Sequence, residues 1–135
     1  MDVVGGVPDI RPYLGGAEVI AVPIRMGGGT RFKVVEALSM GKPIVSTTLG
    51  SEGLPVCDHE HLLLADDPVT FAERIVELFE DPSLRLRLGR SGRSLAERSF
   101  SWQLSGDRLD ALYSRMLADR TVSNRSAGRL EPVHA

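Results

Sequence analysis

Three consecutive glycines, followed by a threonine and an arginine, have the composition of a backbone site for anions. Gly27, Gly28 and Gly29 follow a run of branched apolar residues, and Thr30 and Arg31 begin a helical pattern. Glycine lets the backbone approach a ligand closely, and the free amides at a helix N-terminus carry a positive partial charge. The segment therefore predicts a binding site for a negatively charged group.

The two standard phosphate-binding motifs each fail at one position. Gly27 and Gly29 fit the first two glycines of Gly-x-Gly-x-x-Gly, but Phe32 occupies the third place. A P-loop requires Ser or Thr after Gly-Lys, whereas Gly41 and Lys42 are followed by Pro43. The predicted site is therefore neither a dinucleotide fingerprint nor a P-loop.

Charged side chains accompany the start of the predicted helix. Arg31 and Lys33 lie in its first turn, where an exposed cation opposes the helix dipole by about 0.3–1 kcal/mol. A bound anion would remove this conflict, so both are candidate anion-binding residues. Glu36 has two interpretations: its carboxylate could accept hydrogen bonds from neighbouring hydroxyls such as those of a ribose, or it could pair with Lys33 on the helix surface.

The elements around this segment predict an α/β fold. Residues 18–24 are typical of a strand buried on both faces of a parallel sheet, and residues 43–47 and 61–65 predict two further strands. Between the first two strands we expect a helix over residues 30–40, with Thr30 as its cap. This order is typical of a right-handed crossover between parallel strands.

Helices dominate the rest of the chain. Pro68 opens a helix that ends near Asp81, and six of its residues are predicted to form one apolar face: Phe71, Ala72, Ile75, Val76, Leu78 and Phe79. Two more helices are expected over residues 82–99 and 102–119. The predicted fold is thus a Rossmann-like, three-layer partial domain over residues 1–119, with a short parallel sheet and C-terminal helices. Residues 120–135 are predicted to be a flexible tail.

Composition and charge narrow the classes of protein. Apolar residues make up 42% of the 135 residues and charged residues 25%, as in soluble globular proteins. We find no signal peptide and no long apolar run, and the single cysteine, Cys57, excludes an internal disulfide, so a cytoplasmic location is expected. Residues 1–83 have a net charge of −7 (6 basic, 13 acidic) and residues 84–135 of +5 (10 basic, 5 acidic). The basic part predicts either solvated helix faces or peripheral contact with an anionic membrane; no nucleic acid is expected as a partner.

No metal site is predicted. His59 and His61 form a His-x-His pair without a third ligand nearby in the sequence, so a position in a loop is favoured. Cys57 lacks a basic neighbour that would activate its thiol, which favours a structural role over that of a nucleophile.

The segment Pro23–Thr47 resembles the donor-site segment of the group 1 glycosyltransferases, which are retaining enzymes of the two-domain B fold. Flanking residues agree, namely Gly6–Ile10 and Glu97–Trp102, so the resemblance covers about residues 3–117. It implies that the chain corresponds to the second half of the family's C-terminal, nucleotide-sugar-binding domain. The implied function is that of a glycosyltransferase fragment, which binds a nucleoside-diphosphate sugar for transfer of a hexosyl group to an acceptor.

The resemblance also implies roles for individual residues. The donor-binding residues would be Gly27, Gly28, Gly29, Thr30, Arg31 and Glu36. Glu36 would hold the ribose hydroxyls, and the glycine loop and the helix start would contact the sugar and the diphosphate. The family's usual cations for the leaving diphosphate precede this region, so Arg31 and Lys33 are the catalytic candidates here. The loop Ser51–Gly53 resembles one that could line the donor pocket. The nucleotide sugar is a substrate, and no metal or other cofactor is expected.

The family's acceptor site lies on an N-terminal domain that the resemblance does not cover. We therefore expect either completion by a complementing N-terminal chain or, as an alternative, a non-catalytic, truncated α/β module that needs a partner chain or is inactive. The sequence does not decide whether the isolated chain is an enzyme.

Overall fold

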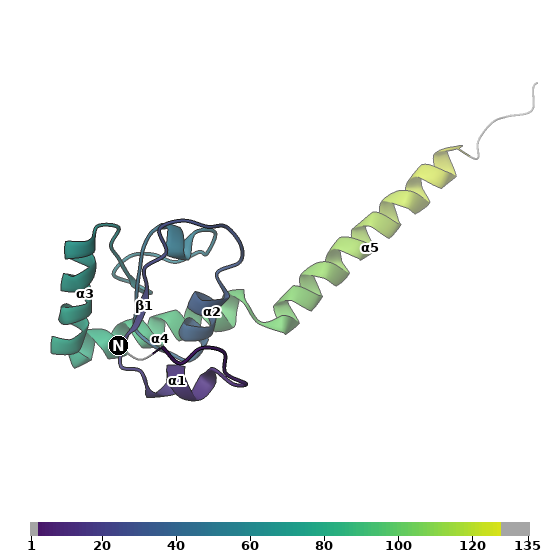
Figure 1. Cartoon of the computed structure of the whole chain (residues 1–135). Coiled ribbons are helices and arrows are strands. Elements are labelled where there is room, and N and C mark those ends of the chain that lie inside the picture. The colour runs from purple at the N-terminus through teal and green to yellow at the C-terminus, as the bar shows by residue number, and fades with distance from the viewer. Residues whose placement is uncertain (1–2, 128–135) are drawn as a thin grey trace, which may run out of the picture. The chain divides into compact units, whose positions relative to one another are not determined.

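The computed structural model describes residues 3–127, with side chains through Leu117. The chain divides into two compact units, Met1–Phe100 and Ser101–Ala135. The first unit contains the parallel sheet and the candidate site, and the second contains the helix α5 (Figure 1).

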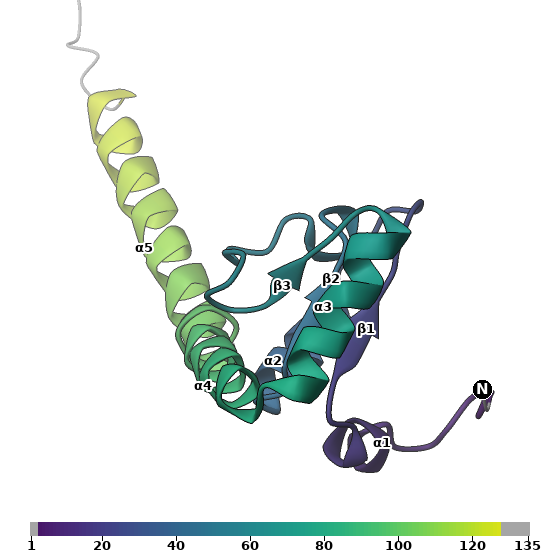
Figure 2. The same ribbon diagram turned by 90° about the vertical axis from the view of Figure 1, so that its left-hand side faces the viewer.

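The sheet of the first unit has three short parallel strands. Its order is β1 (Ile20–Val22), β2 (Ile44–Ser46) and β3 (Leu63–Leu64), which lie side by side in Figure 2. Ile20 is paired with Ile44, and Val45 with Leu63. These findings confirm the predicted α/β class and the short parallel sheet, although each strand is shorter than the apolar run that predicted it.

Helices cover both faces of the sheet. In chain order they are α1 (Arg11–Gly16), α2 (Phe32–Ser39), α3 (Pro68–Glu80) and α4 (Pro82–Ser99), with a 3-10 turn, η1 (Leu49–Ser51), after β2. The sequence places each of the last two helix starts, because an aspartate precedes a proline there. Asp67 accepts hydrogen bonds from the amides of Val69 and Thr70, and Asp81 accepts one from the amide of Leu84.

Consecutive residues of β2 point to opposite faces of the sheet, into two separate cores. Ile44 packs with Val34 and Leu38 of α2, whereas Val45 packs with Leu78 of α3. Helix α4 contributes to both cores, through Ala96 on the first side and Leu84 and Leu88 on the second. The result is the predicted arrangement of three layers, with the sheet between α2 and α3.

Glycines allow α4 to approach α2. A Cβ atom added at Gly89 would overlap the carbonyl of Gly41, and one added at Gly92 would lie 2.6 Å from a methyl carbon of Leu38. Gly41, at the end of α2, has a φ of +65°, which favours glycine. Gly41 therefore ends α2 and also forms part of the surface on which α4 packs.

The predicted helix cap at Thr30 is wrong. The N-cap residue of α2 is Arg31, and no side chain caps this helix. The Arg31 carbonyl accepts the amides of both Val34 and Val35, so the helix begins later than the position of Thr30 predicts. The first amides of α2 consequently have no side-chain acceptor.

The second unit contains a longer helix than predicted. Helix α5 spans Trp102–Ala127, and the hydroxyl of Ser101 accepts the amide of Leu104 at its start. The predicted domain boundary at residue 119 lies inside this helix. Of the predicted flexible tail, residues 120–127 are helical, and residues 128–135 lie outside the described residues. Among the described helices, none is long and apolar enough to span a membrane.

Candidate functional site

The glycine loop leaves the carboxyl end of β1 and is open to solvent. Gly27 and Gly29 have φ values of +114° and +105°, which other residues rarely adopt. A Cβ atom added at either of them, or at Gly28, would meet nothing within 4 Å. The loop conformation thus requires glycine at two positions and leaves its backbone accessible to a ligand.

Arg31 lies beside this loop and is buried, with only 7% of its surface exposed. Its Nη2 atom donates to the Gly27 carbonyl at 3.3 Å and to the Glu52 carboxylate at 3.4 Å. Both bonds are long, and the buried Nε atom has no hydrogen-bond partner. An unpaired buried donor destabilises a fold, by about 1–3 kcal/mol in general, so this guanidinium is poorly satisfied without a ligand.

A hollow of about 310 Å³ adjoins the start of α2. It brings together four of the predicted site residues, Gly28, Thr30, Arg31 and Lys33, and Gly50 of the turn after β2 also lines it. The hollow therefore combines two basic side chains with an uncapped helix N-terminus, and such a combination suits an anion.

A second hollow, of about 290 Å³, contains Glu36. Its walls are mainly apolar and include Leu14, Ile20 and Pro23, and Lys33 lines both hollows. Among the described side chains, no ion pair within 4.0 Å joins Lys33 to Glu36. The structure therefore does not show the predicted alternative, an ion pair between Glu36 and Lys33. Glu36 is exposed, so its carboxylate is accessible to a ligand.

Residues that the sequence did not single out hold the loops in place. The buried hydroxyl of Thr47 donates to the Ile24 carbonyl at 2.6 Å and accepts the Gly50 amide at 2.9 Å. A Cβ atom at Gly50 would lie 2.5 Å from the Ser46 hydroxyl and 2.9 Å from the Val22 carbonyl oxygen. The only sequence signal was a run of hydroxyl residues, 46–48, directly after a buried strand.

The carboxyl end of β3 is tied to the same edge of the sheet. Asp66 accepts hydrogen bonds from both the amide and the hydroxyl of Thr48, each at 2.8 Å. Lys42, which the failed P-loop match had singled out, instead donates to the carbonyls of Gly15 and Ala17 near the end of α1. Its ammonium group therefore has a structural role away from the glycine loop.

A cysteine, a glutamate and a histidine lie together before β3. The potential ligand atoms of Cys57, Glu60 and His61 lie within 4.8 Å of one another. However, Nδ1 of His61 accepts the Cys57 amide at 3.0 Å, so in the neutral ring Nε2 carries the proton. To bind a metal through Nε2, the ring would need a free electron pair on Nε2 and a proton on Nδ1, which would then donate a hydrogen bond instead of accepting one. The arrangement therefore suits a structural hydrogen bond rather than a metal ion.

The fold and the site define an α/β protein with ligand-sized hollows at the carboxyl ends of parallel strands. The sequence profile described as "Glycosyl transferases group 1" matches residues 1–81. The chain therefore belongs to the group 1 glycosyl transferase family, and the resemblance that residues 23–47 carry is confirmed.

Individual relatives agree with this assignment. The D-inositol 3-phosphate glycosyltransferase of Corynebacterium efficiens is 33% identical over 100 residues, which are 73% of this chain and 23% of that protein. Sucrose-phosphate synthase from Thermosynechococcus elongatus matches with a TM-score of 0.70 at 25% identity, over 82% of this chain and 28% of that one. The chain thus spans about a quarter of the length of these relatives.

A solved C-terminal domain shows the same fold at low identity. It belongs to a group 1 family glycosyl transferase from Francisella tularensis and matches with a TM-score of 0.67 at 15% identity. The match covers 76% of this chain and 53% of that domain. The match therefore involves about half of that C-terminal domain.

Proposed function

We propose that the chain supplies donor-binding residues of a glycosyltransferase. In this proposal it binds the nucleoside diphosphate of a nucleotide sugar at the carboxyl ends of β1 and β2. The observation that carries the proposal is the buried Arg31 guanidinium, whose Nε atom has no partner, beside an open glycine loop. Membership of the family supports it.

The two hollows suit different parts of such a donor. The mainly apolar hollow with Glu36 suits the nucleoside, whose ribose hydroxyls would donate to the Glu36 carboxylate. Lys33 lines both hollows, so its ammonium group would bind the diphosphate between them. The sugar would then lie against the backbone of Gly28 and Thr30.

The proposed chemistry is retaining transfer of a hexosyl group. The bond between the anomeric carbon and the diphosphate oxygen breaks, and its electron pair stays on the leaving nucleoside diphosphate. The acceptor hydroxyl forms the new bond and releases its proton. Arg31 and Lys33 would stabilise the charge that develops on the leaving group, and no metal is required by this proposal.

The chain spans about a quarter of the length of these relatives, so the complete transfer reaction is itself part of the proposal. The acceptor would be bound by a complementing chain or domain. Without it, the chain would bind the donor and transfer nothing, as in the alternative of a non-catalytic module.

Calorimetric titration of the purified chain with UDP, GDP and ADP tests the proposal. We expect binding of one of the three nucleotides and a loss of at least about tenfold in affinity for Glu36→Ala, because a charged acceptor of two hydrogen bonds is removed. Glu73→Ala is the matched control, since Glu73 is an exposed acid on α3, and it should bind as the wild type does. A folded chain that binds none of the nucleotides, or a Glu36→Ala variant with unchanged affinity, would contradict the proposal.

A further inference from the structure

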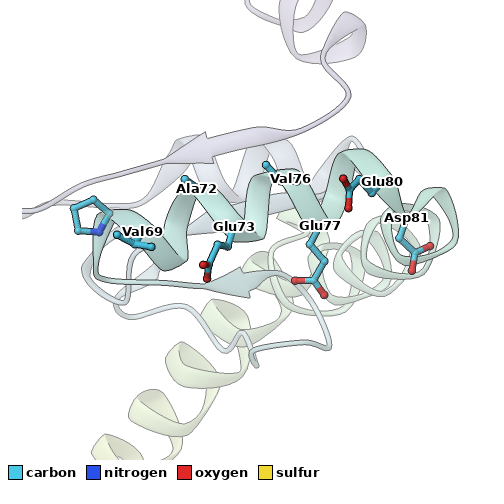
Figure 3. Close-up of a pocket in the computed structure, with 8 residues that line it drawn as sticks. Val69, Ala72, Glu73, Val76, Glu77, Glu80 and Asp81 are labelled. Atoms are coloured by element: carbon cyan, nitrogen blue, oxygen red, sulfur yellow. The ribbon is translucent and has the colours of Figure 1, made fainter.

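The outer side of α3 carries a stripe of apolar residues although it is exposed. Val69, Ala72 and Val76 recur at helical spacing on this side, and the side chains of Val69 and Val76 are 68% and 50% exposed. They line a groove of about 760 Å³ (Figure 3). A solvated helix face normally carries polar residues, so this face has the composition of a contact surface.

One flank of this apolar stripe is acidic. Glu73 and Glu77 line the same groove as Ala72 and Val76, and in Figure 3 their side chains point away from those two residues, along one edge of the stripe. Glu77 is paired with Arg74 at 2.8 Å, whereas Glu73 and Glu80 have no ion-pair partner among the described side chains. No basic residue lines the groove. The flank therefore has unneutralised negative charge beside an apolar surface.

The exposed face of α3 continues toward the edge strand β1. Pro68 and Ala72 also line a second hollow, of about 240 Å³, which reaches Pro23 after β1. In the described part of the chain, β1 pairs only with β2, and Ile20 and Val22 make those hydrogen bonds. The peptide groups of Ala21 between them point away from β2. Among the described residues, β1 is thus an edge strand with no strand on its other side, and the hollow between it and α3 also contains Arg25.

We propose that this surface, which we call the α3 face (Pro68, Val69, Ala72, Glu73, Val76 and Glu80), binds an amphipathic helix of a partner polypeptide. The partner's apolar stripe would cover Val69, Ala72 and Val76, and a basic flank would meet Glu73 and Glu80. The proposal is independent of donor binding.

A second copy of this chain fits the α3 face poorly. In a twofold-symmetric pair of antiparallel α3 helices, the same flank of each helix faces that of the other. Glu73 and Glu80 of one copy would then face the same residues of its partner, and like charges repel. Charge therefore favours a basic partner over self-association.

Two synthetic helical peptides with the same Leu/Ala stripe, one with a lysine flank and one with a glutamate flank, provide the test. Fluorescence anisotropy at low salt should show at least about tenfold tighter binding of the lysine peptide by the wild type. The double variant Glu73→Lys/Glu80→Lys should reverse the preference, and Val76→Asp should weaken both complexes. The same charge change on α5, Asp107→Lys/Asp110→Lys, is the matched control and should leave the preference unchanged.

Other outcomes would overturn the proposal. Equal binding of both peptides would remove the role of the acidic flank, and binding of neither would remove the docking surface. A dimer in sedimentation experiments that Val76→Asp dissociates would assign the face to a second copy instead. Circular dichroism checks that each variant is folded, which we expect because the substituted side chains are exposed.

Discussion

Arg31 is the residue on which the proposed donor site depends most. Burying a guanidinium is favourable only when its donors are satisfied, and here two bonds are long and one donor is unpaired. A residue that is poorly satisfied in the free protein and sits beside an open loop is typical of a site that awaits a ligand. The contribution of Arg31 to ligand binding should therefore be separable from its contribution to the stability of the fold.

The substitution Arg31→Met tests that separation. It keeps an elongated side chain and removes the unpaired charge, so the free energy of unfolding should stay within about 1 kcal/mol of the wild type or rise. Affinity for the nucleoside diphosphate should fall by at least about tenfold. Urea unfolding and calorimetry measure the two effects. Arg74→Met, which removes the other arginine with a buried unpaired Nε, should leave the affinity unchanged.

Either of two results would sink this interpretation of Arg31. A large loss of stability with normal nucleotide affinity would mean that the guanidinium is structural. An equal loss of affinity in Arg74→Met would mean that the effect comes from net charge rather than from the site.

Asp67 makes stability depend on acidic pH. Hydrogen bonding from the side chain and the amide of Thr70, with a smaller effect from the Val69 amide, lowers the pKa of Asp67 below its ordinary value. Because the pKa of Asp67 is lower in the folded than in the unfolded state, its carboxylate stabilises the fold at pH values above its ordinary pKa of about 3.9. This stabilisation is lost as the pH falls through the lowered pKa. The variant Asp67→Ala should therefore have a lower Tm than the wild type at pH 7. This difference in Tm should shrink as the pH falls below about 4. A difference that is constant from pH 7 to pH 3 would contradict this assignment.

At the scale of elements, the packing of α4 on α2 depends on the absence of a side chain. A methyl group at Gly89 would occupy the position of the Gly41 carbonyl, which is backbone and cannot rotate away. Gly89→Ala should therefore lower the free energy of unfolding by about 1–3 kcal/mol, because the helices must separate. Gly106→Ala, in α5, meets nothing within 4 Å and should raise helix stability, by up to about 1 kcal/mol. Chemical denaturation of both variants tests the contrast, and a Gly89→Ala variant as stable as the wild type would contradict the packing.

The starts of α3 and α4 were more predictable than the contacts between elements. The bounds of α4 match the prediction because Asp81, Pro82 and the residues after them carry local start signals. The apolar face predicted for α3 is only partly buried: Leu78 is covered, and Val76 and Phe79 are exposed. Periodicity shows that a helix has an apolar face but not what covers it. Thr30 failed as a cap because the chain enters α2 one residue later.

The site was predictable where its residues are close in sequence. The glycine loop, Arg31, Lys33 and Glu36 lie within one short segment, so their spacing could be interpreted directly. Glu52 reaches Arg31 from 21 residues away and Thr47 reaches Ile24 from 23, and such contacts are set by the register of the sheet. No local pattern encodes that register, which is why Thr47 was missed.

At the scale of the whole molecule, both cores lie inside the first unit. Their buried residues run from Val22 to Ala96, and Phe100 packs against the core that contains α2. The described side chains of α5 are mostly exposed, with Trp102 92% exposed, and neither core includes any of them. The stability of the sheet should therefore come from residues 1–100.

A chain that ends after Ser101 tests this division. We expect it to unfold cooperatively, with a free energy of unfolding within about 0.5 kcal/mol of the full chain, because the residues of both cores belong to the first unit. Urea unfolding followed by far-ultraviolet circular dichroism measures it, and the helical signal should decrease by the contribution of α5 alone. The companion variant Phe100→Ala should be less stable in both lengths, because that side chain packs on a core. A shortened chain that fails to fold would show that α5 stabilises the first unit, and the exposed residues of α5 would then need a place in the fold.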